Sequence, residues 1–195
     1  MQAPERQSIL SLPEMVEFIH DQTGFAGRLA VILGSGLGKF GDLLTDPAII
    51  SYKYIPFYPE TKVEGHAGEF VFGNLDGVEL VVAKGRFHFY EGYDFQTVTL
   101  PIRLFHKLGV SHVIITNAAG SMNKALPPGS LMIMNGHLDC TFRHSVEDPR
   151  LYTGKPYYDP QFIALAEKAA GKLGVFISPG VYCWSLGPAY ETPAE

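Results

Sequence analysis

Four apolar runs in this sequence each end abruptly in a turn of small or polar residues. The runs cover residues 29–33, 80–84, 113–116 and 181–186. Between them, the turns that follow carry a hydroxyl, a guanidinium, an imidazole and a carboxylate, on Ser35, Arg86, His88 and Glu191. A buried strand that ends in a turn of low side-chain bulk places backbone N–H groups at the carboxyl edge of a sheet, where α/β proteins bind ligands. Together these turns predict a pocket for a polar, anionic molecule.

The first turn, Gly34-Ser-Gly-Leu-Gly-Lys39, does not match the common nucleotide loops. A Walker A loop needs a glycine at Leu33 and a Ser or Thr at Phe40, and the dinucleotide fingerprint needs a third glycine at Lys39. What remains is a tight turn with free N–H groups and the Ser35 hydroxyl, which is enough to bind one phosphate. A purely structural turn is the alternative interpretation.

Arg86 and His88 are two residues apart, so on an extended chain their side chains point the same way. The guanidinium fork matches the oxygens of phosphate or carboxylate. Tyr90 has the same parity if the extension continues, and Glu91 is either a surface charge or a partner of Arg86. The alternative is a surface salt bridge beside a hairpin.

The remaining polar candidates are less specific. His66 supplies an imidazole on the approach to a strand, although a lone histidine is more often a structural hydrogen-bonding residue. Asn117 suits the orientation of a polar group on a ligand, with a tightly packed turn as the alternative. His137, Cys140 and His144 resemble metal ligands in their spacing, but no second Cys/His pair closes a tetrahedral site, so we predict no metal.

Composition narrows the class of protein further. A length of 195 residues suits one well-buried domain, residues 1–195. The net charge of −5 and the absence of a clustered Lys/Arg run argue against nucleic-acid binding. Two cysteines, Cys140 and Cys183, are too few for a disulfide framework, which favours a reducing cytoplasm. The early segment Leu10–Ile19 contains Pro13 and two glutamates, so we expect neither a signal peptide nor a membrane span.

Local signals predict an α/β fold with a mixed, twisted central sheet flanked by helices. Ser11-Leu-Pro-Glu14 predicts a capping box and a helix that ends near Gly24. Asp76-Gly77 predicts an antiparallel hairpin between strands 69–75 and 78–84. The other predicted elements are strands 29–33, 113–116, 131–134 and 175–184, a helix start at 40–44, helices 95–108 (interrupted at Pro101) and 161–173, and loops at 52–59 and 141–160.

Five motifs in order resemble those of the trimeric purine nucleoside phosphorylases. They are Gly34-Ser-Gly-Leu-Gly38, Gly65-His-Ala-Gly68, Gly85-Arg-Phe-His-Phe-Tyr-Glu-Gly92, Thr116-Asn-Ala-Ala-Gly120 and Gly187-Pro-Ala-Tyr-Glu-Thr-Pro-Ala-Glu195. The resemblance runs from about residue 28 to the last residue. Each motif alone is weak, but the ordered set is specific. The related methylthioadenosine phosphorylases are a poorer match, because they have a different arginine motif and Thr-Ala-Cys-Gly in place of residues 116–120.

The resemblance implies reversible phosphorolysis of inosine- or guanosine-type nucleosides, which gives a free purine base and ribose 1-phosphate. No metal or organic cofactor is implied, since inorganic phosphate is a co-substrate. The residues implied to hold phosphate are Ser35, His66, Arg86, His88 and the backbone of Ala118. Those implied to contact the nucleoside are Tyr90 at the ribose, Asn117, Tyr190 near the base, and Glu191 as acceptor of the purine N1–H. Among all of these, His66, Arg86 and Glu191 are the expected catalytic residues.

The resemblance also bears on assembly and on the extent of the chain. It implies a homotrimer in which an aromatic residue at about Tyr157 closes a neighbouring subunit's site. The family continues through further strands and helices after the motif that ends at Glu195, so we expect a C-terminally shortened chain. Such shortening leaves a phosphate- or nucleoside-binding protein without turnover as an alternative. A structural or interaction role is disfavoured, because the polar residues converge at strand ends.

Overall fold

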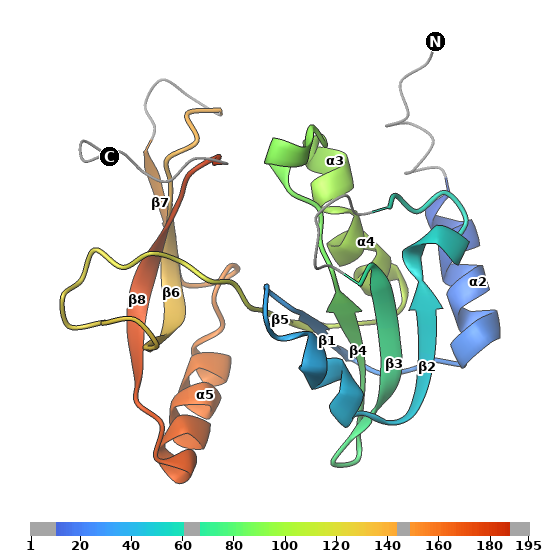
Figure 1. The fold of residues 1–195 in the computed structure, drawn as a ribbon, viewed down its shortest axis with the longest axis horizontal. Helices are drawn as coiled ribbons and strands as arrows, with labels where there is room; N and C mark the ends of the chain where they lie inside the picture. The colour runs from blue at the N-terminus through green and yellow to red at the C-terminus, as the bar shows by residue number, and fades with distance from the viewer. Residues whose placement is uncertain (1–10, 61–66, 144–148, 188–195) are drawn as a thin grey trace. The chain divides into compact units, whose positions relative to one another are not determined.

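Runs of consecutive apolar residues form the centre of a five-stranded sheet in the first part of the chain. The structure is a computed structural model that describes residues 11–60, 67–143 and 149–187. The strands are β1 (Leu29–Ile32), β2 (Thr45–Ser51), β3 (Glu69–Leu75), β4 (Val78–Lys84) and β5 (His112–Ile115), in the order β2-β3-β4-β1-β5 (Figure 1). β4, β1 and β5 are parallel neighbours, whereas β3 is antiparallel to both β2 and β4. The predicted mixed sheet is confirmed.

The helices of this part cover the sheet because its strands are apolar on both faces. They are α2 (Leu12–Thr23), α3 (Phe95–Val98), α4 (Leu100–Lys107) and the short 3₁₀ segments η1 (Gly38–Leu43), η2 (Tyr52–Tyr54) and η3 (Phe89–Glu91). Met15 of α2 and Leu104 of α4 pack with Phe70 and Val81 of the sheet in one buried cluster. A second cluster holds residues of opposite parity, such as Val31, Val71 and Val82. This period of two is the pattern of strands buried on both faces.

The chain divides into two compact units, Met1–Ala119 and Gly120–Glu195. The second unit has a three-stranded sheet in the order β7-β6-β8, with β6 (Leu131–Asp139), β7 (Arg150–Thr153) and β8 (Ile177–Trp184). One helix, α5 (Pro160–Leu173), precedes β8. The single domain over residues 1–195 stays a prediction.

The elements with strong local signals lie where the sequence predicts them. The hairpin β3–β4 has the predicted bounds, and its turn residues Asp76 and Gly77 both have positive φ. α2 ends at Gly24 in the left-handed conformation, and α5 ends at Gly174 in the same way. The helical segment at 95–108 is divided between α3 and α4, just before Pro101.

Two predictions of local structure are wrong, and one strand was missed. Ser11 precedes α2 but its side chain does not cap the helix, since its ψ of 0° differs from the extended backbone that an N-cap serine uses. β7 lies within the segment predicted as loop, residues 141–160. β2 was not predicted, and it begins irregularly, with a register shift after Thr45 that includes Pro47.

Candidate functional site

The carboxyl ends of three adjacent parallel strands meet at one edge of the first sheet. β1 lies between β4 and β5, so the turns after Ile32, Lys84 and Ile115 are neighbours there. A pocket of about 60 Å³ opens at this edge. It is lined by Leu33, Gly34, Ser35, Gly36, Gly38, Ala67, Lys84 and Gly85. A cavity that holds one water needs roughly 10–15 Å³ of such volume, so this pocket has room for a small anion such as phosphate.

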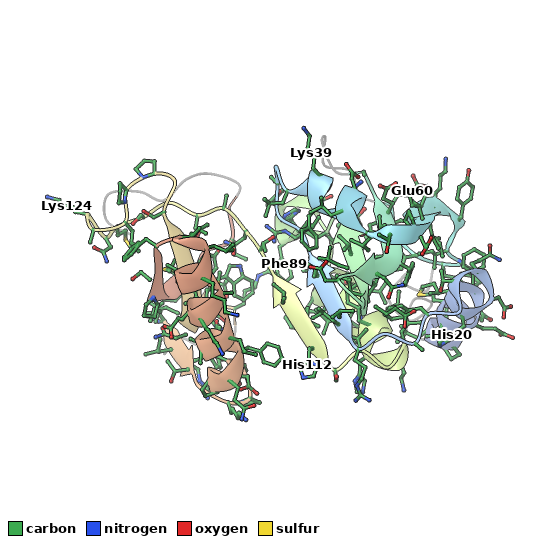
Figure 2. The ribbon with its side chains drawn as sticks, turned by 90° about the horizontal axis from the view of Figure 1, so that it is seen from below. His20, Lys39, Glu60, Phe89, His112 and Lys124 are labelled. Carbon is green, nitrogen blue, oxygen red and sulfur yellow. The ribbon has the colours of Figure 1, made fainter. Side chains whose placement is uncertain are left out.

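The first turn forms the floor of this pocket. The backbone N–H of Leu37 donates to the carbonyl of Gly34 at 3.3 Å, and Gly36 between them has a φ of 85°. Ser35 is exposed and lines the pocket. Its role as a phosphate-binding hydroxyl stays a prediction. Lys39, the last residue of the motif, is exposed and points away from the body of the unit (Figure 2). The turn therefore offers backbone and hydroxyl groups to the pocket and directs its lysine to solvent.

Gly34 permits a close approach between the first and third turns. Its backbone N–H donates to Oγ1 of Thr116 at 2.8 Å. A Cβ atom at Gly34 would lie 2.8 Å from the carbonyl oxygen of Thr116 and 3.0 Å from Cα of Asn117. Both neighbours are backbone atoms that cannot rotate away, so glycine is required here by space.

Arg86 crosses from the second turn to the third. Its Nη1 donates to the carbonyl oxygen of Thr116 at 3.0 Å, and its Nε donates to Nε2 of His88 at 3.1 Å. The prediction that Arg86 and His88 point the same way is confirmed. The guanidinium is partly buried and is fixed by groups from two different turns, which reduces the entropy lost when it binds an anion.

Glu91 pairs with His88, a partner that was not predicted, and its burial contradicts the alternative of a surface charge. Its Oε1 lies 2.9 Å from Nδ1 of His88 and accepts from the His88 backbone N–H at 2.8 Å. The carboxylate is only 5% exposed. The contacts between Glu91 and His88 arise because the extended chain ends at His88 and η3 begins, which brings residue 91 back over residue 88. Glu91 thus orients the imidazole that contacts Arg86.

Tyr90 lies beside the same histidine. Its ring stacks on the His88 ring, with centroids 4.7 Å apart and planes 17° apart. The side chain is 49% exposed, so one ring face remains accessible to solvent or to a ligand. Tyr90 is therefore part of the group formed by Arg86, His88 and Glu91, although the chain is no longer extended at this position.

The other predicted residues are less closely connected with the pocket. Asn117 is partly buried after β5, and its Nδ2 donates to the carbonyl of Ala118 at 3.2 Å. Ala118 is exposed and does not line the pocket. His66, Tyr190 and Glu191 lie outside the residues that the structure describes.

Two contributors were missed from sequence. Thr116 accepts hydrogen bonds from Gly34 and Arg86. These residues are 82 and 30 positions away in the sequence, so no local signal indicates either contact. Lys84 lines the pocket, and its Nζ lies 2.9 Å from Oε1 of Glu69 and 3.4 Å from Oδ1 of Asp42. The Lys84–Glu69 pair could have been predicted from the sequence, because a two-residue turn at Asp76-Gly77 places these residues opposite each other in the hairpin.

An aromatic cluster surrounds His137 in the second unit. The His137 ring stacks on Tyr152 at 4.8 Å, and its Nδ1 lies 2.9 Å from the hydroxyl of Tyr158. Tyr157 packs edge-on against both rings and is 56% exposed. Burial lowers the pKa of His137 below 6.5, and the nearby Asp139 opposes this to a smaller degree. The cluster holds the segment around Tyr157 against β6 and β7.

The described residues show neither a metal cluster nor a membrane-spanning helix. Within residues 11–60, 67–143 and 149–187, no three His, Cys, Asp or Glu side chains gather as metal ligands. His144 of the alternative metal interpretation lies outside these ranges. No helix in the same ranges has the length and apolar character needed to cross a membrane.

The sequence of this chain is similar to those of known proteins over most of its length. Residues 28–195 match the family described as "Phosphorylase superfamily". The chain is 41% identical over 185 residues to "Purine nucleoside phosphorylase 1" of Bacillus subtilis, covering 91% of this chain and 68% of that protein. For the protein of the same name from Geobacillus stearothermophilus, the identity is 38% over 192 residues, covering 95% and 70%.

Solved structures show the same similarity in three dimensions. A crystal structure of the purine nucleoside phosphorylase from Schistosoma mansoni in complex with acetate has a TM-score of 0.85 at 36% identity. A structure of a purine nucleoside phosphorylase in complex with ribose-1-phosphate has a TM-score of 0.86 at 37% identity. Each alignment covers 96% of this chain and 73% of the solved chain.

Proposed function

The chain belongs to the purine nucleoside phosphorylase family, and from this premise we propose that it catalyses the reversible phosphorolysis of purine nucleosides. Phosphate and a nucleoside of the inosine or guanosine type would give a free base and ribose 1-phosphate. The observation that carries this proposal is the position of Arg86, whose guanidinium connects the ends of β4 and β5. Arg86 directly follows Lys84 and Gly85, which line a pocket of phosphate size.

The proposed phosphate site has donors and requires no protein nucleophile. Ser35 and the backbone of its turn would donate hydrogen bonds into the pocket, and Arg86 would donate from the second turn. His88 accepts from Arg86 through Nε2 in this structure, and it remains a proposed phosphate ligand on the basis of the family resemblance. Charge-assisted bonds from Arg86 would supply the largest part of the affinity. His66 and the Ala118 backbone remain proposed phosphate ligands on the basis of the family resemblance.

The proposed chemistry follows from the charges that develop in the reaction. Cleavage of the glycosidic bond leaves positive charge on the sugar and negative charge on the departing purine. A phosphate dianion held at the anomeric carbon stabilises the first, and hydrogen bonds to the base stabilise the second. We assign the base contacts to Tyr190 and Glu191, and the ribose contact to Tyr90, with Asn117 orienting a polar group of the nucleoside. The proposed reaction uses inorganic phosphate as co-substrate and no organic cofactor.

Two further proposals concern the state of the protein in the cell. We propose a homotrimer, which the exposure of Phe57 and Tyr157, 54% and 56%, supports. We also propose a reducing cytoplasmic location, because two cysteines are too few for a disulfide framework.

Release of hypoxanthine from inosine tests the proposed function directly. The reaction should require phosphate, and hypoxanthine and ribose 1-phosphate should form in equal amounts. Calorimetric titration with phosphate alone provides the second measurement. Phosphate binding without hypoxanthine release would indicate a binding protein without turnover, and the absence of both would refute the proposal.

A further inference from the structure

Lys84 is the one described lysine that lines the anion pocket, yet its ammonium is directed at carboxylates. It is the last residue of β4, two positions before Arg86. Nζ lies 2.9 Å from Glu69 Oε1 and 3.4 Å from Asp42 Oδ1. The Lys84 and Glu69 side chains are 16% and 23% exposed, whereas Asp42 is 66% exposed. One cation thus serves two anions at the wall of a pocket that we assign to phosphate.

The charge of this group is negative even with Lys84 present. One ammonium and two carboxylates sum to −1, so Lys84 is not an unpaired positive charge available to an incoming anion. Without Lys84 the same wall would carry −2. Because Lys84 and Glu69 are shielded from solvent, such a charge would be poorly screened and would repel a phosphate dianion. The hydrogen bond that Lys84 donates to Glu69 raises the pKa of Lys84 above its usual value, so the ammonium form persists at neutral pH.

The stem of Lys84 also contacts the segment that follows the phosphate turn. A Cβ atom at Gly41 of η1 would lie only 3.0 Å from Lys84 Cδ, and one at Gly38 would lie 3.9 Å from Cε. The missing side chain at Gly41 therefore leaves the space that the lysine stem occupies. Through Glu69, Asp42 and this packing, Lys84 joins β3, β4 and η1 directly behind the turn at Gly34–Gly38.

We propose that Lys84 is a positioning residue for phosphate, which neutralises Glu69 and Asp42 at the pocket wall and does not itself bind the anion. The inference rests on the proposed function, because it assumes that the pocket takes phosphate. It differs from a direct-ligand role in one respect that can be measured. When Glu69 is neutralised as well, loss of Lys84 leaves the net charge of the group at −1, as in the unaltered chain.

Titration calorimetry with inorganic phosphate tests this inference on the whole chain. Lys84→Gln should weaken phosphate binding by about tenfold, the scale of one poorly screened charge near an anion. The double variant Lys84→Gln/Glu69→Gln should return to within about threefold of the unaltered chain. Lys39→Gln removes an equal charge from the same unit at an exposed position and should change the affinity by less than about twofold.

A series of salt concentrations provides a second measurement. If Lys84 had only a structural role, the difference in phosphate affinity between Lys84→Gln and the unaltered chain would not depend on salt. Part of the affinity lost in Lys84→Gln should return as salt rises from about 0.01 M to 0.5 M, because salt screens the repulsion from Asp42, which is 66% exposed. If Lys84→Gln fails to fold, Asp42→Asn can be tested in its place, because Asp42 is exposed and its substitution should not affect folding. Removal of that carboxylate should tighten phosphate binding, and no change or a weakening would overturn the inference.

The remaining outcomes separate this inference from the proposed function. If the unaltered chain binds phosphate and Lys84→Gln binds it equally well, the inference is overturned and the function stands. If the double variant is as weak as Lys84→Gln, then Lys84 contacts phosphate itself and the charge-balance account is wrong. If the unaltered chain binds no phosphate, the proposed function fails and this inference fails with it.

Discussion

Arg86 donates a hydrogen bond to the carbonyl oxygen of Thr116 across the whole width of strand β1. The two atoms are 3.0 Å apart, although the residues follow β4 and β5, which flank β1 on opposite sides. A side chain from one turn is therefore held by the backbone of another, above the turn that carries Ser35. This contact fixes the guanidinium at the carboxyl ends of β4 and β5 before any anion arrives.

Arg86 should dominate phosphate affinity. Arg86→Ala removes a charged, potentially bidentate donor and should weaken phosphate binding by about tenfold or more, whereas Ser35→Ala should cost about threefold. Calorimetric titration of both variants with phosphate gives the comparison, and circular dichroism checks that each is folded. Equal and small effects would place the phosphate elsewhere.

Gly34 should be intolerant of even a methyl group. Gly34→Ala places Cβ 2.8 Å from the Thr116 carbonyl oxygen, and the resulting backbone shift should lower the free energy of unfolding by about 1–3 kcal/mol. Gly171→Ala is the matched control, because α5 leaves open space at that position. It should stabilise the helix by about 0.5–1 kcal/mol. Urea unfolding of the two variants measures both changes, and similar values for them would contradict the steric argument.

His137 should make the stability of the protein depend on pH. Because burial lowers its pKa below 6.5, the folded state favours the neutral imidazole and the unfolded state binds more protons as the pH falls. The contribution of neutral His137 to the stability of the folded state is complete above about pH 6.5. It is lost as the pH falls through the lower pKa that His137 has in the folded state. Melting temperatures from pH 7.5 to 5 should fall less steeply in His137→Gln than in the unaltered chain.

The exposed histidine His20 provides the control for that experiment. His20→Gln should keep the steep pH dependence of the unaltered chain. An identical slope in His137→Gln would show that His137 does not titrate differently in the two states.

Glu191 should select purines that carry a hydrogen on N1. A carboxylate only accepts hydrogen bonds, so it suits inosine and guanosine, whereas adenosine presents an opposing acceptor at N1. That mismatch costs roughly a few kcal/mol in a desolvated site. We expect kcat/KM to be much higher for inosine than for adenosine, and Glu191→Gln to narrow the ratio, because an amide presents either a donor or an acceptor. Comparable turnover of both nucleosides by the unaltered chain would refute the role of Glu191.

Subunit association should cover the exposed aromatic residues. Phe57 and Tyr157 are more than half exposed, and aromatic side chains are enriched in protein interfaces. Sedimentation velocity should show a trimer. A stable monomer with full activity would contradict the proposal that a neighbouring subunit closes the site.

The sequence predicted those parts of the fold and site that depend on short-range signals. The turn at Asp76-Gly77 defines the hairpin, Gly24 ends α2, and the spacing of Arg86 and His88 places both side chains on one side of the chain. These features need only a few neighbouring residues, so one sequence suffices to identify them.

The features that were missed depend on contacts with distant residues or on weak strands. β7 has only four residues, and β2 includes Asp46-Pro47 at the edge of its sheet, where proline is tolerated. The role of Thr116 arises only when β5 pairs with β1. The pairing of Glu91 with His88 was not predicted, because η3 reverses the chain at a position where extension was assumed.

The hairpin also limits which insertions and deletions the gene can accept. The two-residue turn at Asp76-Gly77 fixes every pair from Leu75–Val78 to Glu69–Lys84, at the far end of the strands. One codon gained or lost in β4 would shift its register and turn Lys84 to the opposite face of the sheet. The turn itself is remote from the pocket and would look like a permissive site for a peptide tag. Its length is nevertheless part of what places the Lys84 ammonium between Glu69 and Asp42.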